Sequence, residues 1–397
     1  MKKAVRKFYY WLKQLKYALR YSKNRQVAIQ NDGILLVTQN FERQGAPVLL
    51  LNIAKWLNNN GYHIVVVSTK YGALIEDFEK YATVLIPSRR SIVGCCQMLN
   101  RKYGYHKAIC NTVVVGNLVQ PLKQMGYTVV SMIHEMENLI RSEGYTQNCD
   151  IIADFSDWIV FPSNYGYQSF AKCTTKKISE NKVRIRNQGL FNVDEQNLSK
   201  SEKRRAICNY LGIDISDKFI VLNVATACYR KGFDLFLDLA YRMRDNEKFC
   251  FIWVGDKTAP ILKRKKGEYN LVSYENLILP GYIVEKNILC DFYGAADILC
   301  LTSREEPFGS IVLEAFNAKT PVIAFSGCGG YMDIVQQDKT GYLVPPFDLA
   351  RLSEKLEEIE QSKSYEMVCE NCGEEVKKHS FDGYCEFIIH LFDGSSR

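Results

Sequence analysis

Two glutamates flank a short turn in the stretch SREEPFGSIVLEAF, residues 303 to 316. Glu306 and Glu314 lie eight positions apart, which on one continuous helix is a rotation of about 800°, so the side chains would be roughly 80° out of register. Pro307 disfavours a helical conformation at Glu306. A helix that begins near Gly309 leaves Glu306 in the preceding loop and puts Glu314 in the second turn. The two carboxylates then flank a helix N-terminus, where backbone amides and the helix dipole bind anions.

Two cations follow an apolar run in the stretch ACYRKGFD. Arg230 and Lys231 come just after the expected end of a strand, Gly232 permits a tight turn, and an apolar helical pattern starts at Phe233. Two cations at a helix N-terminus suit a pyrophosphate. Because Arg-Lys-Gly is also common on protein surfaces, this signal gains its weight from its neighbours.

Hydroxyl and phosphate contacts are expected at two further strand ends. Gly309 allows a backbone to approach a phosphate closely, and Glu314 can accept hydrogen bonds from vicinal hydroxyls such as those of a ribose. Glu306 is placed to do the same for another polyol. Gly329 and Gly330, in the stretch CGGYMD, again let main-chain amides approach a ligand.

These residues need a scaffold of buried strands, and the sequence predicts one. From Gly33 onward, apolar runs alternate with helical stretches, which is typical of parallel strands in doubly wound α/β domains. The polar stretch around 193–217 is the expected linker and first helix of a second domain. The expected strands are 34–38, 63–69, 83–87, 108–112, 128–134, 158–163 and 183–189 in the first half, and 219–226, 249–255, 276–281, 297–303, 321–327 and 341–346 in the second.

Composition excludes several classes of protein. The 397 residues, 47% hydrophobic, are enough for two domains with cores of their own. The 14 cysteines have irregular spacings, which favours reduced thiols in a cytosol over a secreted disulfide framework. Cys369 and Cys372 form a single CxxC and are expected to be structural. The sequence also lacks HExxH, GxxxxGK, GxSxG and Asp-x-Asp motifs, so metal independence is predicted, with cations and helix dipoles neutralising a leaving group.

The first 25 residues carry nine basic and no acidic side chains, which leaves 42 basic against 44 acidic groups in the rest of the chain. A nucleic-acid-binding body is therefore disfavoured. The arm has the pattern of a basic amphipathic helix that lies on an anionic membrane surface. The alternative is a solvated helix that packs on the body or on a partner. The candidate membrane-binding residues are Lys2, Lys3, Arg6, Lys7, Trp11, Lys13, Lys16 and Arg20.

Taken together, the motifs resemble a known family. Lys231-Gly232, the spacing within EEPFGSIVLEAF, and the stretches PVIAFSGCGGYMDIV and TGYLVPPFD look like the donor-binding half of retaining glycosyltransferases of family 4, which have the two-domain GT-B fold. The stretch 44–68 is similar to the acceptor-side opening of that family. IHEMENL (133–139) and NQGL (187–190) resemble bacterial surface-polysaccharide members.

The resemblance implies an organisation and a set of roles. It implies an arm (1–25), an acceptor-side domain (26–192), the linker (193–217), a nucleotide-sugar donor-binding domain (218–378) and a C-terminal helix (379–397) that returns to the first domain. Glu314 would hold the ribose, Lys231 the diphosphate, and Glu306 the donor sugar. His134 would face the sugar, although a buried histidine bonded to backbone is the plainer alternative. The remaining candidate donor-binding residues are Arg230, Phe308, Gly309, Ser310, Gly45 (in the loop facing the phosphates), Gly329 and Gly330.

The expected activity is transfer of a sugar from a UDP, GDP or dTDP donor to an acceptor hydroxyl with retention, without a cofactor or metal. The expected acceptor is a lipid-linked or growing surface glycan, and the expected location is the cytoplasm, peripheral on the inner face of the plasma membrane. One departure matters: the family usually has an arginine five or six positions before the lysine, where this chain has Ala225 and Thr226. Arg230 is the candidate replacement for it.

Two other classes of function stay open at this point. A glycan phosphorylase or nucleotide-sugar epimerase on the same scaffold would release sugar phosphate or form product without an acceptor. A catalytically silent glycan-binding or scaffold protein would show no donor turnover with any acceptor.

Overall fold

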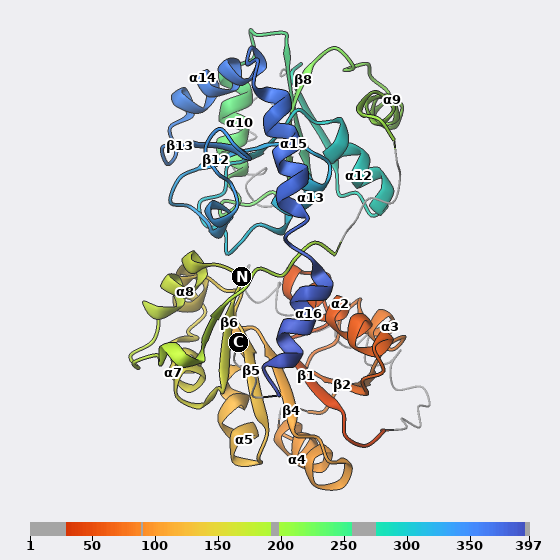
Figure 1. The fold of residues 1–397 in the computed structure, drawn as a ribbon, viewed down its shortest axis with the longest axis vertical. Helices are drawn as coiled ribbons and strands as arrows, with labels where there is room; N and C mark the ends of the chain where they lie inside the picture. Colours follow the sequence, from red (N-terminus) through yellow and green to blue (C-terminus); the bar gives the residue numbers. More distant parts are fainter. Residues whose placement is uncertain (1–28, 89, 192–197, 256–274, 394–397) are drawn as a thin grey trace, which may run out of the picture. The chain divides into compact units, whose positions relative to one another are not determined.

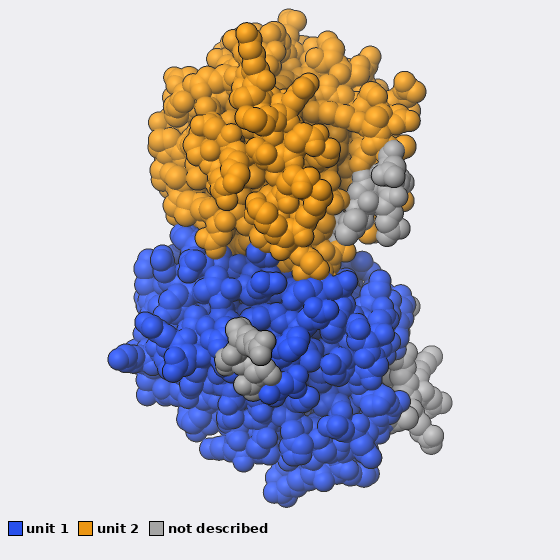
Figure 2. Space-filling view, in the orientation of Figure 1, with its two compact units in different colours: residues 1–188, 382–397 blue, residues 189–381 orange. Residues whose placement is uncertain are grey.

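The computed structural model describes residues 29–88, 90–191, 198–255 and 275–393. The chain divides into two compact units, unit 1 with residues 1–188 and 382–397, and unit 2 with residues 189–381 (Figure 2). The sequence-based boundary at residue 192 lies close to this division. Each unit consists of a sheet flanked by helices (Figure 1). The predicted membrane-binding arm lies outside the described residues.

Unit 1 contains a seven-stranded sheet in the order β3-β2-β1-β4-β5-β6-β7, in which every pair is parallel. Most strand residues are apolar and buried, as expected for a parallel sheet that helices cover. The strands are β1 (Ile34–Thr38), β2 (Ile64–Val67), β3 (Thr83–Leu85), β4 (Lys107–Asn111), β5 (Thr128–Met132), β6 (Trp158–Phe161) and β7 (Val183–Ile185).

The helices of unit 1 connect these parallel strands and cover the sheet. One comes from the end of the chain, where the Trp158 indole donates a hydrogen bond to the Leu391 carbonyl at 2.7 Å. They are α2 (Gly45–Asn59), α3 (Ile75–Phe78), α4 (Ile92–Tyr103), α5 (Val119–Gln124), α6 (Glu137–Ser142), α7 (Thr146–Phe155), α8 (Asn164–Ala171) and α16 (Phe381–His390), with short 3-10 turns η1 (Val113–Leu118) and η2 (Glu180–Lys182).

Unit 2 contains a six-stranded parallel sheet in the order β10-β9-β8-β11-β12-β13. Its strands are β8 (Phe219–Val224), β9 (Phe249–Val254), β10 (Leu277–Gly281), β11 (Ile298–Leu301), β12 (Val322–Phe325) and β13 (Gly341–Val344). Its helices are α9 (Lys200–Leu211), α10 (Phe233–Arg242), α12 (Lys286–Ala295), α13 (Ser310–Asn317), α14 (Leu349–Glu360) and α15 (Tyr365–Val376), with the 3-10 turn η3 (Gly330–Asp333).

The strand order reverses between β1 and β4 in unit 1 and between β8 and β11 in unit 2. Ligands of open α/β sheets bind at such switch points, outside the carboxyl ends of the strands. The loops after β8 and β11 are those that hold Lys231 and Glu306. In unit 1, Gly45 follows β1 and His134 follows β5.

The prediction of two doubly wound domains is confirmed, since each of the apolar runs singled out in the sequence overlaps one of the strands. The cysteines are free thiols, and the Cys372 thiol lies 3.2 Å from the Thr340 carbonyl in the core of unit 2. Among the described residues, no helix combines the length and the apolar character that crossing a bilayer requires.

Candidate active site

The loops after β8 and β11 are packed against each other so closely that one position must be glycine. Gly232 has a left-handed conformation with φ of 67°, and a Cβ atom there would lie 1.8 Å from the Thr302 carbonyl oxygen. The Thr302 hydroxyl in turn donates a hydrogen bond to the Gly232 carbonyl at 2.9 Å. This contact brings Lys231, just before Gly232, beside the loop that carries Glu306.

Glu306 is the centre of a charged cluster in unit 2. Its side chain is 9% exposed and forms an ion pair with the Lys231 ammonium, while the Arg230 guanidinium lies 3.8 Å from the same carboxylate oxygen, Oε2. Arg230 also donates to the Glu305 carbonyl at 2.9 Å and is 44% exposed. Burial alone would raise the pKa of Glu306, but the attraction of Lys231 and Arg230 outweighs it and lowers the pKa below its ordinary value. Glu306 is therefore an anion at neutral pH.

The backbone fixes Glu306 from two sides. Its N–H donates to the Cys328 carbonyl at 2.9 Å, and its carbonyl accepts from the N–H of Gly330 at 3.0 Å. Gly329 must be glycine here, because a Cβ atom would lie 2.4 Å from the Tyr331 ring and 2.8 Å from Cβ of Glu306. The loop after β12 thus holds the carboxylate in place.

Helix α13 begins where the sequence predicted. Gly309 is its N-cap residue with φ of 84°, no side chain caps the terminus, and Glu314 lies in the second turn. An uncapped helix N-terminus offers its first amides to an anion. Ser310 is the first helical residue. Phe308 is only 2% exposed, so its side chain belongs to the core of unit 2, and the contact predicted for this residue is that of its main-chain amide.

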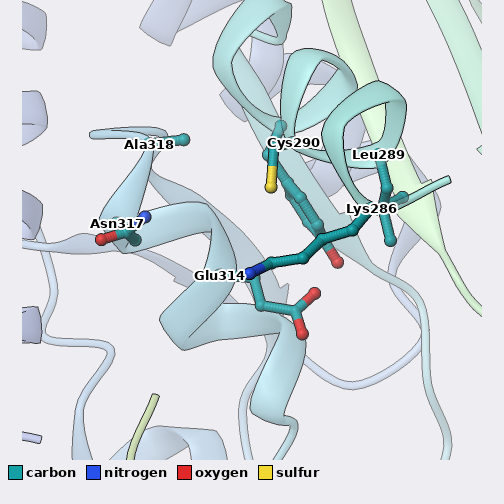
Figure 3. A pocket seen from close by; sticks show the side chains of 7 residues that line it. Lys286, Leu289, Cys290, Glu314, Asn317 and Ala318 are labelled. Carbon is teal, nitrogen blue, oxygen red and sulfur yellow. The ribbon is translucent and has the colours of Figure 1, made fainter. Parts of the chain in front are cut away.

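Glu314 lines a pocket between α12 and α13 (Figure 3). The Lys286 side chain extends from α12 toward Glu314 in this view. The Tyr293 hydroxyl is buried beside it, and burial, followed by the negative charge of Glu314, raises the pKa of Tyr293 well above its ordinary value. A pocket lined by a carboxylate, a cation and a phenol is suited to hold vicinal hydroxyls. The other residues of the lining are Leu289, Cys290, Asn317 and Ala318.

Arg304 ties the Lys231 loop to the Glu306 loop. Its guanidinium donates to both carboxylate oxygens of Asp234 at 2.8 and 2.7 Å and to the Tyr229 carbonyl at 2.6 Å. It also stacks on the Tyr229 ring at 3.7 Å, and its backbone N–H donates to the Arg230 carbonyl at 2.8 Å. Arg304 therefore fixes the main chain of the loop that carries Arg230 and Lys231.

Replacing Arg304 with lysine is expected to weaken donor binding about tenfold, because lysine cannot reproduce the fork to Asp234 or the stacking on Tyr229. The lost charged hydrogen bonds should also cost about 1.5 to 3 kcal/mol of stability. The measurements are a thermal melt and a donor titration. Arg351→Lys, on an exposed face of α14, is the matched control, and equal donor affinity in the wild type and Arg304→Lys would contradict the assignment.

In unit 1, the structure connects the Gly45 region with His134 through a residue that the sequence analysis did not single out. Asn111, the last residue of β4, lies 2.9 Å from the His134 ring and donates to the Ala46 carbonyl at 2.9 Å. Gly45 is exposed and is the first residue of α2. It therefore begins the helix, whereas the sequence placed it in the loop before the helix. A position at a strand end, in AICNT, was the available signal for Asn111.

Two titratable groups follow β5 in unit 1. Burial lowers the pKa of His134 to about 4, so the imidazole is neutral at pH 7. Burial raises the pKa of Glu135 to about 7. The Glu135 carboxylate accepts hydrogen bonds from the backbone N–H groups of Val113 and His134, and these bonds oppose the rise. His134 thus has a side-chain partner, unlike the plainer alternative of a histidine bonded to backbone.

The structure therefore brings most predicted residues of unit 2 together. Lys231, Arg230 and Glu306 are in contact, and Glu314 lines the neighbouring pocket. Gly309 and Ser310 begin α13, and Gly329 and Gly330 begin the 3-10 turn η3. Arg304, Tyr293 and Lys286 were not predicted. Within the described ranges, no group of three or more His, Cys, Asp or Glu side chains is arranged to hold a metal ion.

Comparisons with known proteins find similar sequences over much of unit 2. Residues 213–379 match the family "Glycosyl transferases group 1". An uncharacterized glycosyltransferase of Methanocaldococcus jannaschii is 26% identical over 55% of this chain and 56% of its own length, and a Klebsiella pneumoniae protein described as lying in the cps region is 28% identical over 49% of each. The chain thus spans about half the length of the curated relatives it matches.

Among solved structures, Anabaena HepE in complex with UDP and glucose is similar, with a TM-score of 0.76 and 17% identity over 92% of this chain and 100% of that one. At this identity the likeness establishes the fold, which is GT-B. For residues 213–379, the resemblance to glycosyltransferases inferred from the motifs is confirmed by the family match.

Proposed function

We propose that this chain is a retaining glycosyltransferase, which moves a sugar from a nucleotide-sugar donor to the hydroxyl of a membrane-associated lipid-linked or growing surface glycan. The observation that carries the proposal is the cluster of Lys231, Arg230 and buried Glu306 beside the uncapped N-terminus of α13. This cluster lies within the residues that match the group 1 family. The similar Klebsiella protein of the cps region supports a surface glycan as product.

In the proposed reaction, the bond between the anomeric carbon and the diphosphate oxygen breaks while the acceptor oxygen bonds to that carbon on the same face. The acceptor proton passes to the departing phosphate oxygen, so no separate base is required. Negative charge grows on the diphosphate, and Lys231, Arg230 and the α13 amides stabilise it. These groups supply the neutralising charge without a metal or cofactor.

The remaining residues orient the donor. The Glu306 carboxylate, ionised and fixed by its backbone, accepts hydrogen bonds from sugar hydroxyls, and Glu314 accepts them from the ribose. His134 contacts the donor sugar from unit 1. Arg230 binds the donor diphosphate in place of the arginine that similar enzymes have at the position of Ala225 or Thr226. The UDP bound to Anabaena HepE supports a nucleoside diphosphate as the leaving group.

The test is a thermal-shift assay of the full chain across UDP-, GDP- and dTDP-sugars. A ligand at 100 times its Kd should stabilise the protein by about 2.7 kcal/mol. We expect sugars of one nucleotide class to raise the melting temperature, and Glu314→Ala to abolish this increase. A donor of that class with a labelled sugar should then transfer the label to an acceptor. The absence of any shift would overturn the proposal in favour of a catalytically silent scaffold, and turnover that requires phosphate in place of an acceptor would favour a phosphorylase.

Residues 1–25 are proposed to hold the enzyme on the cytoplasmic face of an anionic membrane, at about 1 kcal/mol per basic residue near the surface. The full chain should co-sediment with vesicles that contain anionic lipid, and a chain that starts at Gln26 should not. Neutral vesicles are the control, because they lack the surface potential. Equal sedimentation of the two chains with anionic vesicles would remove the membrane assignment.

A further inference from the structure

Asn111 is fully buried at the end of β4 and bonds to two candidate regions of unit 1. Its Nδ2 atom donates to the Ala46 carbonyl in the first turn of α2 at 2.9 Å, and its Oδ1 atom lies 2.9 Å from Nε2 of His134. In the sheet it pairs with Thr38 of β1 and Met132 of β5, on the two sides of the switch strand. His134 comes two residues after Met132.

The hydrogens of this chain of contacts can be assigned by elimination. The Ala46 carbonyl can only accept, so the Asn111 amide nitrogen must face it and Oδ1 must face the histidine. Oδ1 also can only accept, so Nε2 of His134 must carry the hydrogen. A neutral imidazole has a single N–H, and burial keeps this ring neutral with a pKa of about 4. Nδ1 is then left with its lone pair.

Among the described residues, no second hydrogen-bond partner of the ring is found. The nearest titratable group along the chain, Glu135, directs its carboxylate to the backbone N–H groups of Val113 and His134. Within the part of the chain that the structure describes, Nδ1 of His134 has no hydrogen bond. A neutral amide in place of a carboxylate at position 111 also avoids the charge that would favour a protonated ring.

We propose that Asn111 is a positioning residue that fixes His134 as the Nε2–H tautomer, so that Nδ1 accepts a hydrogen bond from a hydroxyl of the donor sugar. The inference rests on the proposed function, from which it takes the sugar as ligand. An acceptor atom at this place has a consequence for specificity. A sugar with a hydroxyl there is favoured, and one with a carboxylate there is disfavoured, because two lone pairs would face each other.

The tautomer can be measured directly by long-range 1H–15N correlation spectra of the full chain labelled with 15N-histidine. The chain has five histidines, and His134→Gln assigns the relevant signals by their loss. At pH 7.5 we expect a pyrrole-like Nε2 and a pyridine-like Nδ1. A Nδ1–H tautomer or a charged ring in the wild type would overturn the proposal without reference to any variant.

Asn111→Asp tests the positioning role. The carboxylate cannot donate to Ala46 and should protonate the ring, and kcat/KM should fall about 10- to 100-fold, as for the partners that orient metal-bound histidines. Asn52→Asp, which adds the same charge on α2, should leave the His134 signals unchanged. Full activity of Asn111→Asp with a charged ring would overturn the role, whereas a wild type with the expected tautomer and no turnover with any donor would overturn only the proposed function.

Discussion

Replacing Lys231 with alanine is expected to lower kcat/KM for sugar transfer by about two to three orders of magnitude. Removing one group that stabilises developing negative charge has effects of this size in other enzymes. Lys231 is the cation closest to Glu306, and the contact between Gly232 and Thr302 holds it there. The loss should appear mainly in kcat, because the charge on the diphosphate grows in the transition state.

Two variants bracket this result. Lys339→Ala removes an exposed lysine of unit 2 and should retain wild-type kinetics. Arg230→Ala should have a smaller effect than Lys231→Ala, since Arg230 is 44% exposed and lies 3.8 Å from the carboxylate. If Lys231→Ala kept wild-type kcat/KM, the assignment of the leaving-group site would be wrong. If Arg230→Ala had no effect, Arg230 would not replace the missing arginine.

Glu306→Gln should lower kcat/KM about 100-fold and destabilise the protein by about 1 to 3 kcal/mol, because Lys231 would lose its ionic partner. The pKa of Glu306 is lowered in the folded protein, so its stabilising effect is present above the unfolded pKa of about 4.3 and is lost as the pH falls through the lower folded value. The stability difference between wild type and Glu306→Gln should therefore be constant from pH 6 to 8 and shrink in acid.

Urea denaturation at several pH values measures that difference. Glu366→Gln, an exposed position on α15, is the control and should show little change in either activity or stability. A difference that does not shrink below about pH 4 would contradict the ionic pairing of Glu306. Unchanged activity in Glu306→Gln would remove Glu306 from the set of residues that bind the sugar.

The sequence predicted those features that depend on local patterns. The buried strands read as apolar runs, and Pro307 with Gly309 marked the start of α13 closely enough to separate Glu306 from Glu314. Lys231 and Glu306 were both identified because each follows a strand. The carboxyl ends of neighbouring parallel strands must meet at one edge of the sheet.

The partners of these residues were not predictable, because they are joined only by the fold. Arg304 bonds to Asp234 across 70 positions and Asn111 bonds to Ala46 across 65. Nothing in the local sequence of either residue indicates such a partner. The burial that shifts the pKa values of His134 and Glu135 is likewise a property of the packed unit, and no periodicity reports it.

The division of unit 1 into two stretches of chain has a consequence for biosynthesis. Residues 382–397 complete this unit, yet they leave the ribosome only after all of unit 2. Tyr384, Cys385 and Ile388 of this segment are buried in the folded protein. The apolar surface that they cover in unit 1 is therefore exposed while residues 189–381 are translated. Unit 2 is continuous in sequence and can finish folding first. Premature termination before α16 should therefore destabilise unit 1, although it is translated first, and leave the stability of unit 2 largely unchanged.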